Sequence, residues 1–364
     1  MRDLRRLFAV ALMFSSITVA SGCRSTPVAG GADVPRTVLE SEATLRFVDT
    51  NGIRMRIAEQ GQGPLVLLLH GWPESWYSWR HQLRALAEAG YRAVAPDMRG
   101  FGGTDAPEDV EAYDVLDLCA DTVGLLDALG AETAVLVGHD WGAAVAWSCV
   151  QLEPSRFTAI AALSVPRGRR QPEPFLERMR KKYGENFFYM LYFQQPGVAE
   201  AELEADPRAL LTRLFTSPDT PREPPEITDP KAAAGGFIGR LGAPTELPPW
   251  LSEKDLDYYV SELTRTGFSG GLNYYRNIGR NRELTPQLAD AQVAVPALFI
   301  AGDKDLVIGG LDRAALEELM RPVVPELRGL HLLSGAGHWI QQERAEEVNA
   351  LLIDFLRSLP FDDG

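Results

Sequence analysis

Short apolar runs and longer segments with helical periodicity alternate along most of the chain. A short continuous apolar run is typical of a strand buried on both faces, whereas an amphipathic segment of ten or more residues is typical of a helix. Asn51-Gly52, between residues 45–49 and 53–59, indicates a hairpin. The later predicted strands are residues 64–69, 93–96, 134–137, 160–165, 297–300 and 329–333. The predicted helices are residues 79–89, 116–129, 141–151, 312–320 and 343–357.

This alternation predicts an α/β fold, with a mostly parallel sheet and helices on both faces. The alternation stops over residues 167–286, which are rich in aromatic residues and arginine. We interpret that segment as a helical cap inserted into a core of residues 41–166 and 287–360. A cap of this kind is expected to roof an apolar pocket.

Composition narrows the class of protein. The chain has 364 residues, of which 45% are hydrophobic and 24% are charged, as is ordinary for a globular protein. A net charge of −14 argues against nucleic-acid binding. Cys23, Cys119 and Cys149 have no metal-ligand spacing, so we expect no metal site.

The N-terminus has the pattern of an export signal. Basic residues precede an apolar run over residues 7–20, which is too short to span a membrane as a helix. Ala20-Ser21-Gly22-Cys23 resembles a bacterial lipoprotein cleavage box, so Cys23 is a candidate for lipidation. We therefore expect a signal peptide over residues 1–23, a flexible tether over 24–40, and an exported protein whose membrane contact is through a lipid anchor. Ordinary secretion to the periplasm or the medium, and a cytoplasmic protein with a non-functional leader, are the alternatives.

The candidate chemistry centres on Gly138-His139-Asp140-Trp141-Gly142, between a predicted strand and a predicted helix. Small residues on both sides of the central position are typical of a nucleophile elbow, in which the nucleophile is exposed on a tight turn. Here that position holds Asp140, where serine is usual. A carboxylate is a poor nucleophile toward acyl carbon, but it can attack an sp3 carbon and form an ester. The substitution predicts a hydrolase that is neither an esterase nor a protease.

An elbow nucleophile is followed along the chain by an acid and then by a histidine. After Asp140 the only histidines are His331, within a predicted strand, and His338, in the glycine-rich loop after that strand. Because active sites of parallel sheets lie at the carboxyl ends of strands, His338 is favoured. Asp303 and Asp305 follow residues 297–300, and either carboxylate could orient an imidazole.

His70-Gly71-Trp72-Pro73 follows another predicted strand. In this arrangement the backbone N–H groups of Trp72 and Trp141 are expected to form an oxyanion hole.

Four motifs together resemble the soluble epoxide hydrolases of the α/β-hydrolase fold. The resemblance covers residues 45–356, and its motifs are His70-Gly71-Trp72-Pro73-Glu74-Ser75-Trp76-Tyr77-Ser78-Trp79-Arg80, Gly138-His139-Asp140-Trp141-Gly142, Tyr192-Phe193-Gln194-Gln195-Pro196-Gly197 and Asn273-Tyr274-Tyr275-Arg276-Asn277. The elbow and the turn at Gly71 are shared with haloalkane dehalogenases, so the two cap motifs distinguish the families.

The resemblance implies an eight-stranded sheet and a reaction that needs no cofactor. By resemblance, Tyr192 and Tyr275 activate the oxygen of a small apolar epoxide while Asp140 attacks carbon. His338, oriented by Asp305 in preference to Asp303, activates the water that releases a 1,2-diol. The substrate pocket is expected to be lined by His70, Gly71, Pro73, Trp141 and Trp339.

Two other functions fit parts of the sequence. A haloalkane dehalogenase would use the same aspartate, but its halide needs N–H donors such as the indoles of Trp72 or Trp141. A non-catalytic envelope binding protein on a hydrolase scaffold would tolerate replacement of Asp140.

Overall fold

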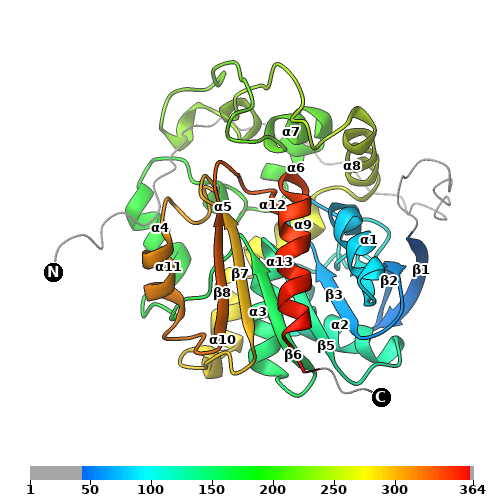
Figure 1. Ribbon diagram of the computed structural model, residues 1–364. Coiled ribbons are helices and arrows are strands. Elements are labelled where there is room, and N and C mark those ends of the chain that lie inside the picture. Colours follow the sequence, from blue (N-terminus) through cyan, green and yellow to red (C-terminus); the bar gives the residue numbers. More distant parts are fainter. Residues whose placement is uncertain (1–42, 361–364) are drawn as a thin grey trace.

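A single eight-stranded sheet organises the chain in the computed structural model, which describes residues 43–360 (Figure 1). The strands are β1 (Thr44–Thr50), β2 (Ile53–Gln60), β3 (Leu65–Leu69), β4 (Arg92–Pro96), β5 (Ala134–His139), β6 (Phe157–Leu163), β7 (Ala297–Gly302) and β8 (Leu327–Leu333). Their order in the sheet is β1-β2-β4-β3-β5-β6-β7-β8. The first two strands form the predicted hairpin, β2 is antiparallel to β4, and all later pairs are parallel. The predicted α/β-hydrolase fold is therefore confirmed.

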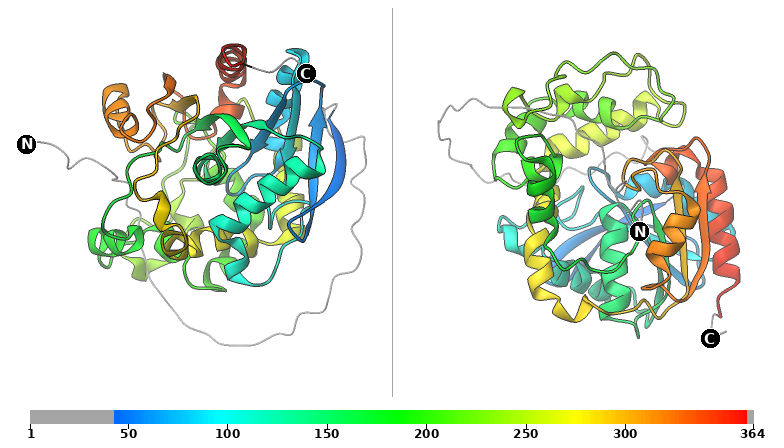
Figure 2. Two further views of the ribbon diagram at one scale, coloured as in Figure 1. Left: turned by 90° about the horizontal axis from the view of Figure 1, so that it is seen from below. Right: turned by 90° about the vertical axis from the view of Figure 1, so that its left-hand side faces the viewer.

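Helices cover both faces of the sheet. The core helices are α1 (Arg80–Glu88), α2 (Val115–Ala128), α3 (Trp141–Leu152), α11 (Arg313–Met320), α12 (Ile340–Glu343) and α13 (Ala345–Arg357). In the right-hand view of Figure 2, α13 lies on one side of the sheet, and α3 and α11 lie on the other. The central strands β3 and β5 are buried along their whole length, which explains their continuous apolar sequences.

The segment between β6 and β7 contains mostly short helices. They are α4 (Phe175–Tyr183), α5 (Tyr189–Tyr192), α6 (Val198–Leu203), α7 (Pro207–Leu214), α8 (Glu253–Thr266), α9 (Ser269–Arg276) and α10 (Ile278–Leu284). Figure 1 shows α6, α7 and α8 above the carboxyl ends of the parallel strands. This part of the inserted segment covers the edge of the sheet at which the elbow lies.

The predicted signal peptide, Cys23 and the tether over residues 24–40 lie outside the described residues. Within residues 43–360, no helix has the length and apolar character needed to cross a bilayer.

Close backbone packing fixes the turn between β5 and α3. A Cβ atom on Gly142 would lie 2.0 Å from the carbonyl oxygen of Leu69 in β3. A Cβ on Gly138 would lie 2.4 Å from the carbonyl oxygen of Gly142. Both glycines are therefore required because the helix begins in direct contact with the strands.

Gly142→Ala is expected to lower the free energy of unfolding by at least about 2 kcal/mol, because the added methyl group would have to displace backbone. Urea denaturation of the purified variant measures this change. Gly279→Ala is the matched control, since a Cβ at that helical glycine meets nothing within 4 Å. Equal stability of the two variants would contradict the packing argument.

Candidate active site

Asp140 occupies a strained turn at the carboxyl end of β5. Its backbone angles are φ 51° and ψ −119°, a conformation that is costly for a residue with a Cβ and that recurs at functional sites. The side chain remains 17% exposed although the strand before it is buried. Burial would raise the pKa of Asp140, but His338, His139 and the Trp72 amide together hold that pKa below its ordinary value. The group is therefore a carboxylate at neutral pH.

The turn after β3 holds one oxygen of this carboxylate. The backbone N–H of Trp72 donates a hydrogen bond to Asp140 Oδ1 at 2.9 Å. A Cβ on Gly71 would lie 2.4 Å from the Cβ of Asp140, so only glycine permits this approach. Trp141 is the first residue of α3, and its amide therefore belongs to the donor end of that helix. The two segments predicted to form the oxyanion hole thus meet at Asp140.

His338 faces both a buried carboxylate and the elbow. Its Nδ1 lies 3.0 Å from Asp305 Oδ2, and its Nε2 lies 3.7 Å from Asp140 Oδ2. Asp303 instead accepts a hydrogen bond from the Gly335 N–H at 2.8 Å. His331 lies within β8, opposite Ile300 of β7. The structure therefore brings Asp305, and not Asp303, to His338.

The charges around His338 determine its protonation. Burial would lower the pKa of His338, but the two carboxylates of Asp305 and Asp140 raise it well above its ordinary value. In turn, burial would raise the pKa of Asp305, and His338 holds it below its ordinary value. His338 is therefore an imidazolium while both carboxylates are ionised.

A second buried network, which the sequence did not predict, supports the histidine loop. Glu74 accepts hydrogen bonds from the side chains of Gln341 and Gln342 and lies 2.8 Å from His139 Nδ1. The other ring nitrogen of His139 lies 2.8 Å from the backbone carbonyl of His338. The signal was the position of Glu74 directly after the turn at Gly71 and of His139 directly before Asp140.

Two cap tyrosines lie near Asp140, but only one of them was predicted. Tyr275 in α9 is buried, and its ring meets the Trp141 ring edge-on at a centroid distance of 5.1 Å. Burial and the negative charge of Asp140 raise its pKa well above its ordinary value. Tyr189 in α5 lies edge-on to Tyr275 at 5.9 Å, and burial followed by the charges of Asp140 and Asp305 raises its pKa. Both hydroxyls are therefore protonated at neutral pH.

The structure contradicts the expected position of Tyr192. Its hydroxyl donates to Glu202 Oε2 at 2.8 Å, and Glu202 also accepts from the backbone N–H groups of Phe237 and Ile238. Burial and the charge of Glu202 raise the pKa of Tyr192, with no contribution from Asp140. Tyr192 therefore ties together parts of the cap, and Tyr189, one helical turn earlier, takes the position that the sequence analysis gave to it.

The five residues expected to line the substrate pocket differ from one another in burial and in contacts. His70 is fully buried behind the turn, where its Nε2 accepts from the Met98 N–H and its Nδ1 meets the Gly71 carbonyl, so it is not a lining residue. Gly71 and Pro73 belong to the buried turn itself. Trp339 packs its ring 4.9 Å from that of His338 and donates its indole N–H to the Leu214 carbonyl. Trp141 is only partly buried and lies beside Tyr275.

No group of three or more His, Cys, Asp or Glu side chains within residues 43–360 is arranged to hold a metal ion.

Glu74→Gln is expected to lower the free energy of unfolding by about 2–4 kcal/mol, because an amide cannot accept from all the donors that surround this buried carboxylate. Denaturant unfolding measures the loss, with the exposed Glu283→Gln as control. A variant as stable as the control would show that the network does not support the loop.

Known proteins resemble the chain over nearly all of the described residues. Residues 64–345 match the family model described as alpha/beta hydrolase fold. Epoxide hydrolase A of Mycobacterium tuberculosis is 50% identical over 321 residues, which cover 87% of this chain and 98% of that protein. Epoxide hydrolase 2 of Siraitia grosvenorii is 44% identical, over 85% of this chain and 97% of its own. The crystal structure of Epoxide Hydrolase A from Mycobacterium thermoresistibile superposes with a TM-score of 0.80 at 50% identity, covering 88% of this chain and all of that one. The chain therefore belongs to the epoxide hydrolase family and has the α/β-hydrolase fold.

Proposed function

We propose that this epoxide hydrolase converts a small apolar epoxide and water to a 1,2-diol through a covalent ester on Asp140. The observation that carries the proposal is an ionised carboxylate on the elbow, 3.7 Å from His338 Nε2, with two protonated tyrosines, Tyr189 and Tyr275, whose pKa values its charge raises. The relatives that cover most of the chain are named for the same reaction class.

In the first step Asp140 Oδ2 attacks one epoxide carbon, and the bond from that carbon to the epoxide oxygen breaks. Oδ1 is held by the Trp72 amide, which leaves Oδ2 for the substrate. The departing alkoxide is far more basic than a phenol, so a tyrosine hydroxyl can protonate it. Tyr275 and Tyr189 supply these donors, and their raised pKa values keep them protonated until the alkoxide forms.

Before the second step His338 gives its proton to the tyrosinate left by the first step. The neutral imidazole then takes a proton from water, and the hydroxide attacks the carbonyl carbon of the ester. The amides of Trp72 and Trp141 stabilise the tetrahedral oxyanion. The bond between Asp140 Cγ and Oδ2 then breaks, and the departing alkoxide takes the remaining hydroxide proton and leaves as the diol. His338 keeps the proton from water and is again the imidazolium of the resting enzyme. Asp305 orients the imidazole through Nδ1 throughout.

Esterification itself prepares His338 as a base. Before the reaction, the charges of Asp305 and Asp140 both raise the pKa of His338. The ester removes the charge of Asp140, so one of these two contributions disappears and the pKa of His338 falls. His338 can then give up its proton to the tyrosinate, and the neutral imidazole can accept a proton from water.

The arrangement favours this reaction over halide release from a haloalkane. The Trp141 ring packs edge-on against that of Tyr275, with 5.1 Å between the ring centroids, so the indole and the cap tyrosine are in contact. Protonated hydroxyls near a carboxylate suit a leaving oxygen, which must gain a proton.

Export through the signal-like segment 1–23, with lipidation at Cys23, is part of the proposal. It is supported by the order of basic, apolar and small residues in that segment.

Tyr275→Phe and Tyr189→Phe are each expected to slow ester formation by about 10²- to 10⁴-fold, because each removes a donor to the epoxide oxygen. Stopped-flow measurement of a single turnover with a neutral epoxide gives this rate. Tyr192→Phe is the matched control and should change the rate by less than about threefold, since its hydroxyl is bound to Glu202. A large loss of rate in Tyr192→Phe, with little change in Tyr189→Phe, would instead support the catalytic role that the sequence predicted for Tyr192.

His338→Gln is expected to accumulate the ester, because the nucleophile remains while the base for hydrolysis is lost. Intact-protein mass spectrometry after addition of epoxide should show the mass of one substrate added to Asp140.

Asp140→Asn is the control and should give no adduct. Lowering the pH should cause wild-type enzyme to accumulate the same ester, because His338 of the ester form, whose pKa has fallen, then keeps its proton, while the lowered pKa of free Asp140 keeps the nucleophile ionised. Rapid diol formation by His338→Gln without an adduct would contradict the proposed mechanism.

A further inference from the structure

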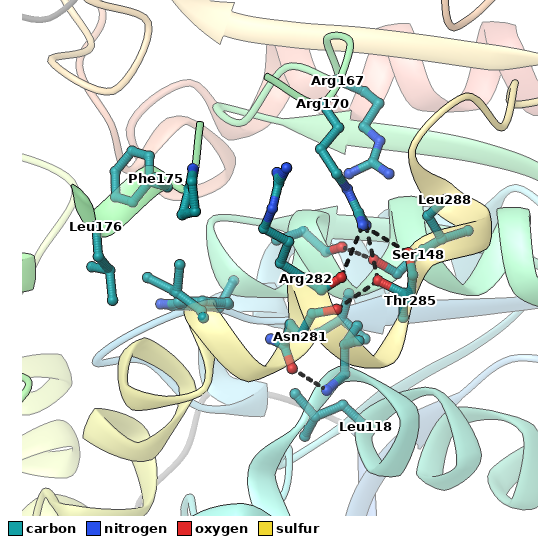
Figure 3. A pocket seen from close by; sticks show the side chains of 17 residues that line it. Leu118, Ser148, Arg167, Arg170, Phe175, Leu176, Asn281, Arg282, Thr285 and Leu288 are labelled. Carbon is teal, nitrogen blue, oxygen red and sulfur yellow. Dashed lines mark hydrogen bonds between the residues drawn. The ribbon is translucent and has the colours of Figure 1, made fainter. Parts of the chain in front are cut away.

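A cavity of about 310 Å³ lies where the cap joins the core, and Asp140 and His338 do not line it (Figure 3). Its walls come from α3, from the chain entering the cap at residues 167–176, and from α10 where the chain leaves the cap. The volume is at the lower end of the range for small-molecule sites.

Three arginines converge on this cavity without any carboxylate. Among the described residues that line it, Arg167, Arg170 and Arg282 are the only charged ones. Within residues 43–360 none of the three forms an ion pair, although the whole chain carries a net charge of −14. Such an arrangement leaves the positive potential of the cavity uncompensated.

Two of these arginines have a structural role. Arg170 donates to the Thr285 carbonyl at 2.7 Å and to the Thr285 hydroxyl at 2.8 Å (Figure 3). Arg282 donates to the carbonyls of Gln171 and Pro172 at 2.8 and 2.6 Å. These bonds join the two segments that connect cap and core. All the acceptors are neutral, so the charges themselves remain unbalanced.

Arg167 does not take part in these hydrogen bonds between the two connecting segments. Its Nη2 donates to the side-chain oxygen of Gln151 at 2.5 Å, and its Nε is buried without a hydrogen-bond partner. Burial and the nearby charge of Arg170 lower the pKa of Arg167 to about 10. A buried guanidinium of this kind is expected to be compensated by an anion, and its planar donors suit a carboxylate.

The remaining wall is mostly apolar. Its apolar members include Leu118, Trp141, Phe175, Leu176, Ile278 and Leu288. The cavity therefore combines a cationic side with a surface suited to a hydrocarbon.

We propose that this cavity is a second ligand site, which binds a monocarboxylate with a short apolar body through Arg167, Arg170 and Arg282. The carboxylate accepts from the guanidinium groups, and the hydrocarbon contacts the apolar wall. Trp141 belongs to this wall, and its ring also meets Tyr275 at 5.1 Å. The bound carboxylate thus contacts a residue of the active site without occupying the place of the epoxide.

Calorimetric titration of the purified enzyme with octanoate tests this site, with 1-octanol as the uncharged probe. Octanoate should bind saturably, and 1-octanol should bind at least about tenfold more weakly because it lacks the charge. Arg167→Gln should weaken octanoate binding by about tenfold or more. Arg169→Gln is the matched control, since Arg169 is exposed, carries the same charge and does not line the cavity.

Gly279→Leu provides a second test that leaves all three arginines in place. Gly279 lines the cavity, and a Cβ there meets nothing within 4 Å. A leucine at this position should therefore fill the site and abolish octanoate binding. Turnover of a neutral epoxide should persist. Absence of saturable octanoate binding to the wild type would overturn the proposal. Equal losses of octanoate affinity in Arg167→Gln and Arg169→Gln would also overturn it. So would octanoate that competes with the epoxide in the wild type and still binds to the Gly279→Leu variant.

Discussion

The close contact between the turn after β3 and the turn after β5 is the constraint on which the site depends. Asp140 can adopt its strained backbone conformation with positive φ because Gly138, Gly142 and Gly71 leave no side chain in the way. The same contact brings the Trp72 amide to one carboxylate oxygen, so the geometry for nucleophilic attack exists before a substrate arrives. Backbone packing, rather than side-chain mobility, therefore fixes the reactive atom.

Electrostatics complements this geometry. Two carboxylates on either side of His338 keep the imidazole charged, and the imidazolium keeps both carboxylates ionised. This balance depends on the charge of Asp140, and ester formation removes that charge. The proposed chemistry therefore needs no change of conformation to convert His338 from a partner of the nucleophile into a base. Glu74 and His139 hold the backbone of the histidine loop from the other side.

The sequence predicted the core well because a few consecutive residues are enough to identify each strand and the elbow. Each buried strand is a short apolar run, and the elbow with its glycines stands in five consecutive residues. The cap was harder to predict. Tyr189 and Tyr192 lie three residues apart in one helical turn, so they lie on the same side of the helix and periodicity cannot separate them. Glu202 and Asp140, which are distant in sequence from each other, decide which hydroxyl faces the site. His70 was placed in the pocket because of its motif, but its ring turns inward to the Met98 amide.

The central claim is that Asp140 becomes covalently bound to the substrate, and one isotopic measurement tests it directly. A single turnover with a neutral epoxide in ¹⁸O-labelled water, followed by peptide mass spectrometry, locates the oxygen that water supplies. Attack of water on the ester should place the label in the peptide that contains Asp140, and the first diol should carry an oxygen from the enzyme. Label found only in the diol, with none in that peptide, would show that water attacks the epoxide directly and would contradict the ester mechanism.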